Sequence, residues 1–143
     1  MPDNLQLASD LRTVIARLVK KLRKESVTGQ QLSLTERSSL ALLQQYKQLL
    51  PSELASMEKI TNQSMSQILN HLMELGYIIR TTSAADRRKI FISLTAEGEK
   101  TILKVRHERD EWLAKAITDT CGKEEQELLQ QAIRPLTKLV DFE

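Results

Sequence analysis

The residues best suited to chemistry lie between positions 61 and 89, and they are hydrogen-bonding and basic groups. Six polar side chains gather in one segment: Thr61, Asn62, Gln63, Ser64, Ser66 and Gln67. Asn and Gln can bind an adenine edge through two hydrogen bonds, and Ser and Thr can bind bases or phosphates. Five charged side chains follow: Arg80, Asp86, Arg87, Arg88 and Lys89. Arginine suits a narrow DNA minor groove, because its guanidinium is weakly hydrated and the potential there is strongly negative. The two sets predict binding to double-stranded DNA. The alternatives are a solvated polar face and a surface Asp-Arg pair that only stabilises a hairpin.

Residue types that serve catalysis or metal binding are sparse. His71 and His107 have no second ligand at metal spacing, and Cys121 alone cannot form an internal disulfide or a thiolate metal site. Four glycines form no glycine-rich phosphate loop, and no nucleophile, base and orienting group can be assembled from motif spacing. We therefore predict no metal, no cofactor and no enzyme activity. We interpret both histidines as surface or junction residues and Cys121 as a small apolar residue at a helix end.

Length and charge favour one soluble domain over residues 1–143. No run approaches the roughly 18 uncharged apolar residues of a spanning helix, and Asp3 and Asp10 stand where a signal peptide would be basic and then apolar. We therefore expect a cytoplasmic protein with no membrane partner. Residues 1–95 carry 13 basic and 8 acidic side chains, whereas residues 96–143 carry 8 and 11. A polyanion would therefore contact the first two thirds of the chain.

Helical periodicity and capping signals predict the elements that hold the polar set. Apolar residues recur every three or four positions over residues 7–22, which is typical of an amphipathic helix. Ser33 and Glu36 have the spacing of a capping box for a helix to about residue 46, after a polar loop at 26–33. A short helix should begin at Pro51. The polar set lies on a helix over residues 61–75, with Thr61 as its N-cap and Gly76 as its C-terminal stop.

The second half of the chain changes to short strands and then to long helices. Two runs rich in β-branched residues, 77–82 and 89–94, predict a small hairpin that carries the basic set near its tip. Helices at about 95–120 and 123–140 follow, and Pro135 should kink the last one, because proline removes one backbone hydrogen bond.

The order helix, helix, short helix, turn, helix, hairpin is that of a winged helix-turn-helix. The predicted class is mainly α with a small β-hairpin (α+β), with the winged motif at about 34–95. The segments SLTERSSLALL, PSELA, ITNQSMSQILNHLMELGYIIR and DRRKIFISLTAEGE resemble the MarR family of bacterial transcriptional regulators.

This resemblance implies a homodimer whose terminal helices, about 4–25 and 96–141, interlock. Each subunit would set one recognition helix into the major groove of a pseudo-palindromic site, with half-sites roughly 34 Å apart. The family's Asp-x-Arg motif matches Asp86 and Arg88. It makes Arg88 the minor-groove residue, Asp86 the carboxylate that orients it, and Arg87 a phosphate contact. Arg80 and Lys89 flank the motif. Most members are repressors that a small aromatic or anionic effector releases from DNA.

The residues of the terminal helices agree with the dimer. These helices carry more apolar surface than a monomer of this size would be expected to bury. The expected interface residues are Leu11, Leu18, Leu22, Leu113, Ile117, Leu129, Ile133, Leu136 and Leu139. The alternative is that the helices pack on one another within a monomer.

The effector site is expected where the DNA-binding region meets the dimerisation helices, at Arg17, Lys21 and His107. The alternative is that these are solvated charges of a constitutive repressor.

The recognition helix has no Lys or Arg between Ile60 and Ile79, so its attraction to phosphates must come from elsewhere. The alternative function is a winged-helix protein that binds a partner regulator, or DNA without sequence preference.

Overall fold

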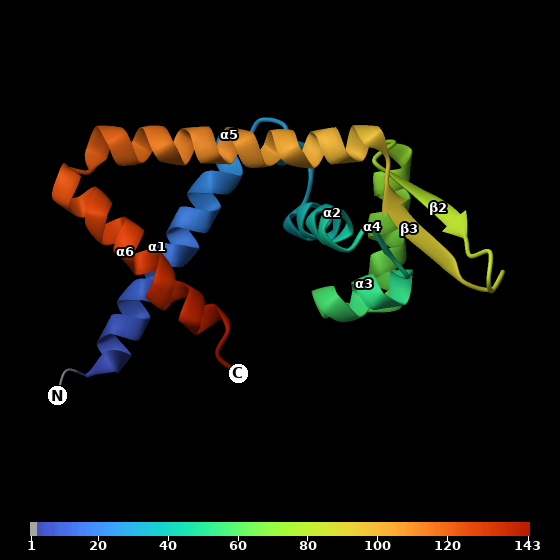
Figure 1. The fold of residues 1–143 in the computed structure, drawn as a ribbon, viewed down its shortest axis with the longest axis horizontal. Coiled ribbons are helices and arrows are strands. Elements are labelled where there is room, and N and C mark those ends of the chain that lie inside the picture. Colours follow the sequence, from blue (N-terminus) through green and yellow to red (C-terminus); the bar gives the residue numbers. More distant parts are fainter. Residues whose placement is uncertain (1–2) are drawn as a thin grey trace.

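The computed structural model describes residues 3–143 and is built around one long helix, α5, from which two groups of helices extend (Figure 1). The helices are α1 (Asn4–Glu25), η1 (Gly29–Gln31, a 3₁₀ turn), α2 (Leu34–Tyr46), α3 (Pro51–Glu58), α4 (Asn62–Glu74), α5 (Ala96–Thr120) and α6 (Lys123–Val140). The strands are β1 (Gln48–Leu49), β2 (Ile78–Thr82) and β3 (Ile90–Leu94). The predicted class, mainly α with a small hairpin, is confirmed. No helix within residues 3–143 has the length and apolar character needed to cross a bilayer.

The sheet has three antiparallel strands in the order β1-β3-β2. Strands β2 and β3 form the predicted hairpin, in a register that pairs Ile78 with Leu94 and Thr82 with Ile90. The sequence did not predict β1, which adds Gln48 opposite Ser93 on the other side of β3. Two residues are too few to show the alternation by which a strand is recognised.

The core lies between α2, α3, α4, β3 and the first half of α5. Its largest fully buried side chains include Leu40, Leu43, Leu54, Met65, Leu69, Leu72, Ile92 and Ile102. Helix α4 buries Met65, Leu69 and Leu72, which recur at helical spacing on one face. Because this face packs on the core, the polar face of α4 is left to solvent.

Helix α5 begins against the end of α4. Gly76 adopts φ +80°, which ends α4 as predicted. The backbone N–H of Thr95 donates to the Tyr77 carbonyl (3.0 Å), and its hydroxyl donates to the Gly76 carbonyl (2.6 Å). A Cβ on Gly98 would lie 2.0 Å from the Tyr77 oxygen. Only glycine fits this close approach, so the ends of α4 and α5 are held together.

Helix α6 extends from the far end of α5 and helix α1 meets α5 near its middle, and neither contains a buried residue (Figure 1). Helix α6 continues through Pro135 to Val140. The segment at 26–33 is more ordered than the predicted loop. Ser26 is fully buried, accepts from the Gly29 N–H (3.0 Å) and donates to Glu108 Oε1 on α5 (3.3 Å). The contact that holds the buried Ser26 comes from α5, whose Glu108 lies 82 residues further along the chain.

Candidate nucleic-acid interface

The start of α4 is fixed by the predicted N-cap. Helix α3 ends at Lys59, whose φ of 56° reverses the chain in the left-handed region. Thr61 Oγ1 then accepts from the Ser64 N–H (3.0 Å) and donates to Ser64 Oγ (3.0 Å). Both hydroxyls therefore take part in the cap, and this places the first turn of α4 at a defined angle to α3.

Four of the six predicted recognition residues remain free at the surface of α4. Asn62, Gln63, Ser66 and Gln67 are exposed, and none of their side chains makes a hydrogen bond to any residue within 3–143. One turn further on, Asn70 Oδ1 accepts from Arg80 Nη2 of β2 (3.3 Å). Arg80 therefore contacts α4 itself, which carries no basic residue between Ile60 and Ile79.

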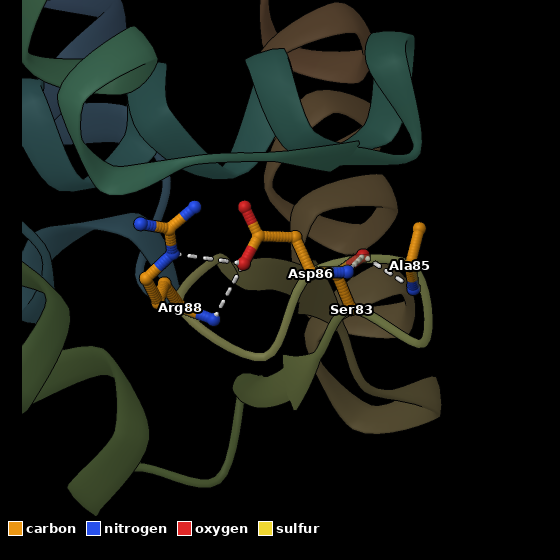
Figure 2. Close-up of polar contacts among 4 residues, drawn as sticks. All are labelled: Ser83, Ala85, Asp86 and Arg88. Atoms are coloured by element: carbon orange, nitrogen blue, oxygen red, sulfur yellow. Dashed lines mark hydrogen bonds and ion pairs between the residues drawn. The ribbon is translucent and has the colours of Figure 1, made fainter.

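The β2–β3 hairpin, with the turn between Thr82 and Ile90, is the wing, and its tip is ordered by hydrogen bonds to two side chains (Figure 2). Asp86 Oδ1 accepts from both the backbone N–H (3.0 Å) and the Nε (3.3 Å) of Arg88. Ser83 Oγ accepts from the N–H groups of Ala85 (3.2 Å) and Asp86 (3.3 Å). The side chain of Asp86 is 33% exposed and that of Arg88 is 92% exposed. The carboxylate thus holds one edge of the guanidinium while the rest faces solvent.

The tertiary structure brings the polar helix and the basic wing to one hollow of about 390 Å³. Asn62 and Ser66 line it from α4, and Arg88 and Lys89 line it from the wing. Its remaining lining residues are Leu50, Pro51, Ser52 and Ile90. Amide, hydroxyl and cationic side chains therefore line the same space, and these are side-chain types that contact DNA bases and phosphates.

A histidine on α4 forms a contact that the sequence did not predict. The Nδ1 of His71 is hydrogen-bonded to Glu36 Oε2 on α2, and Glu36 Oε1 accepts from the Ser33 N–H (2.8 Å), completing the predicted capping box. Burial raises the pKa of Glu36, but hydrogen bonds from the Ser33 N–H and His71, with the charge of His71, outweigh it and leave this pKa below 4.5. The hydrogen bond to Glu36 is the main reason why the pKa of His71 lies above 6.5.

The adjacent residue, Arg37, is buried at 4% exposure, and sequence reasoning assigned it no role. Its Nη2 lies 3.5 Å from the Arg23 carbonyl oxygen of α1. Burial lowers the pKa of Arg37, and the nearby cations Arg109 and Arg23 lower it further. Glu36 and Arg37 therefore contact different helices, α4 and α1.

The three residues of the predicted effector site have separate surroundings. Lys21 Nζ lies 5.9 Å from the centre of the Trp112 ring. His107 Nε2 lies 2.9 Å from Glu111 Oε1 on its own helix, and Arg17 is exposed on α1. A cavity of about 440 Å³ opens between α2 and α5, and Arg106 is its lining residue from α5. No cluster of three or more His, Cys, Asp or Glu side chains within the described chain is suited to a metal ion.

The predicted interface residues lie at the surface of the three terminal helices. Leu18, Leu129, Ile133 and Leu139 are 40%, 46%, 63% and 61% exposed. Leu11, Leu22, Leu113, Ile117 and Leu136 are half-buried. A groove of about 680 Å³ follows α1 and is closed by Leu139 of α6, and most of its lining is aliphatic. So much exposed apolar surface is typical of an interaction site.

Comparison with known proteins supports the assignment of this fold to DNA-binding regulators. A model of the MarR family matches residues 30–89. The HTH-type transcriptional regulator MT0903.1 of Mycobacterium tuberculosis is 28% identical over 141 residues, which cover 99% of this chain and 97% of that protein. A crystal structure of a transcriptional regulator from Pseudomonas aeruginosa superposes with a TM-score of 0.82 at 31% identity and covers all of both chains. A mutant MarR from E. coli shares the fold with a TM-score of 0.72 at 16% identity, covering 89% of this chain and 96% of that one. The chain therefore belongs to the MarR family of DNA-binding transcriptional regulators.

Proposed function

We propose that this regulator binds a pseudo-palindromic operator as a homodimer, acts as a repressor, and leaves the operator when a small molecule binds. The observation that carries the proposal is the shared hollow between α4 and the wing. There Asn62 and Ser66 can reach base edges while Arg88 reaches the adjacent backbone or minor groove. The remaining residues assigned to DNA are Thr61, Gln63, Ser64 and Gln67 on the helix side and Arg80, Asp86, Arg87 and Lys89 on the wing side.

The terminal helices support the homodimer. Neither α1 nor α6 buries a residue within the chain, so the apolar groove along α1 remains open. Covering it with a second copy would remove the exposed leucines and isoleucines from water, at about 25 cal/mol per Å² of apolar surface. Two-fold symmetry would then present two α4 helices, about one helical turn of DNA apart.

The effector part of the proposal rests on residue types. The cationic Arg17 and Lys21 of α1, with His107 of α5, suit a small aromatic or anionic compound, and the three side chains have separate surroundings in the described chain. Such a compound can release DNA only by binding one conformation of the dimer more tightly than the other, with about 1.4 kcal/mol needed for each tenfold loss of operator affinity.

The most direct test is fluorescence anisotropy with DNA from upstream of the protein's own gene and with the same bases scrambled. We expect tighter binding to the natural sequence at equal salt. Equal affinity for both would refute operator recognition and favour non-specific or partner binding.

A further inference from the structure

The hydrogen bond between His71 and Glu36 joins two elements whose relative position decides where the recognition helix points. His71 lies in the second half of α4, and Glu36 lies in the first turn of α2. The side chain of His71 is 46% exposed, and that of Glu36 is 9% exposed. Glu36 has little freedom, because its other oxygen is held by the Ser33 N–H (2.8 Å) and its own N–H donates to Ser33 Oγ (3.1 Å). The imidazole of α4 is therefore attached to a fixed carboxylate on α2.

Charged groups on α4 and on the elements packed against it have partners of their own or reinforce this contact, and Arg37, beside Glu36 on α2, lies against the Arg23 carbonyl of α1. Helix α4 packs against α2, α3 and β2. From α3, Glu58 accepts from Ser38 Oγ (2.6 Å), and from β2, Arg80 donates to Asn70 (3.3 Å). On α4 itself, Glu74 favours the charged form of His71, as Glu36 does more strongly. The contact with Glu36 thus selects the imidazolium, and the pKa of His71 lies above its ordinary value of 6.5.

We propose that His71 is a positioning residue for DNA recognition: its protonated ring, bound to Glu36, holds α4 on α2 in the orientation that binds the operator. This inference rests on the proposed function. The apolar contacts of Met65, Leu69 and Leu72 hold α4 on the core, but packed helices can still shift or rotate slightly against one another. A charge-assisted hydrogen bond is directional, so it restricts that motion. Side chains that read base edges need their positions fixed to within about 0.5 Å.

The sign of the pH dependence follows from the raised pKa. The contribution of the pair is complete below pH 6.5 and is lost as pH rises through the pKa of His71 in the folded protein. Operator affinity should therefore fall as pH rises above 6.5. We expect a loss of roughly two- to tenfold, which is the lower part of the range of coupling between paired side chains.

The test is operator affinity of the full chain, measured by anisotropy at a series of pH values from about 6 to 8.5. In H71Q, affinity should vary much less over this range and should match the wild-type value at the alkaline end. R134Q, on the exposed surface of α6, is the control and should retain the wild-type profile. H107Q removes the only other histidine and serves to assign the His71 signals. ¹⁵N NMR of the wild type and H107Q gives the pKa of His71 independently of DNA.

The variant E36Q separates positioning from simple attraction between an imidazolium and DNA. Glutamine can still accept from the Ser33 N–H, so the cap of α2 is kept, but His71 loses its charged partner. We expect E36Q to show a flattened profile like that of H71Q, with equal circular dichroism. A wild-type-sized pH dependence in E36Q, merely moved toward pH 6.5, would overturn the proposal, as would a flat profile in the wild type. If the wild type binds its operator no better than scrambled DNA at every pH, the proposed function fails and this inference fails with it.

Discussion

Replacement of Arg88 by alanine tests how the wing takes part in DNA binding. The side chain is 92% exposed, and its carboxylate partner Asp86 is 33% exposed. An ion pair of this exposure contributes at most about 1 kcal/mol to stability. We therefore expect R88A to keep its circular dichroism and nearly all of its melting temperature. Any loss of operator binding can then be assigned to the interface with DNA.

The magnitude follows from counterion release. A dimer carries two copies of Arg88, and each cation placed among the DNA phosphates, in the minor groove or on the backbone, contributes about 0.9 to the slope of log affinity against log salt concentration. Loss of both contacts should flatten this slope by about 1.8. Over a fourfold increase in salt, from about 50 to 200 mM, the gap in affinity between the wild type and R88A should therefore shrink by about tenfold.

Anisotropy titrations at several salt concentrations measure this slope directly. R87A is the matched control in the wing, because it removes the same charge from the adjacent exposed position. It should flatten the slope similarly, and any larger loss in R88A reports the orientation that Asp86 gives to Arg88. R134A, on the exposed surface of α6, should leave the slope unchanged. A folded R88A protein with the wild-type slope would show that the Asp86-Arg88 pair serves only the hairpin.

Four further predictions concern assembly, fold and regulation. Light scattering should give the wild type twice the 16.3 kDa chain mass. L129K places a charge on the apolar face of α6 and should give one chain mass. A wild-type monomer at every micromolar concentration would refute the proposal of two half-sites. G98A should lower the unfolding free energy by roughly 1–3 kcal/mol in denaturant titrations, because its Cβ would lie 2.0 Å from the Tyr77 oxygen; unchanged stability would show that the junction of α4 and α5 is not tight. Because the pKa of Glu36 is lowered, its contribution to stability is present above pH 4.5 and is lost as pH falls through its pKa in the folded protein; the difference in unfolding free energy between the wild type and E36Q should therefore shrink toward pH 3, and a constant difference would contradict this. Thermal-shift screening of phenolic and carboxylate compounds should find ligands that also release operator DNA; ligands that only raise the melting temperature would bind both conformations equally and would count against effector control.

Short-range signals in the sequence determined the elements of this protein. The cap at Thr61, the apolar spacing of the residues that follow and the stop at Gly76 define α4, and all three are seen in the structure. The run of β-branched residues at 89–94 likewise predicted β3. These signals depend on residues within a turn or two of one another, so they can be read without knowing the packing.

Only the tertiary structure decided how these elements meet. The hollow that joins α4 to the wing, the pairing of β1 with β3, and the burial of Arg37 all involve residues far apart in the chain. The contact between His71 and Glu36 spans 35 positions. The sequence revealed Glu36 as a capping residue, but one carboxylate oxygen suffices for a cap. The partner of the second oxygen depends on which helix packs beside α2, because a side-chain contact across the core is set by the packing of whole elements and not by local spacing.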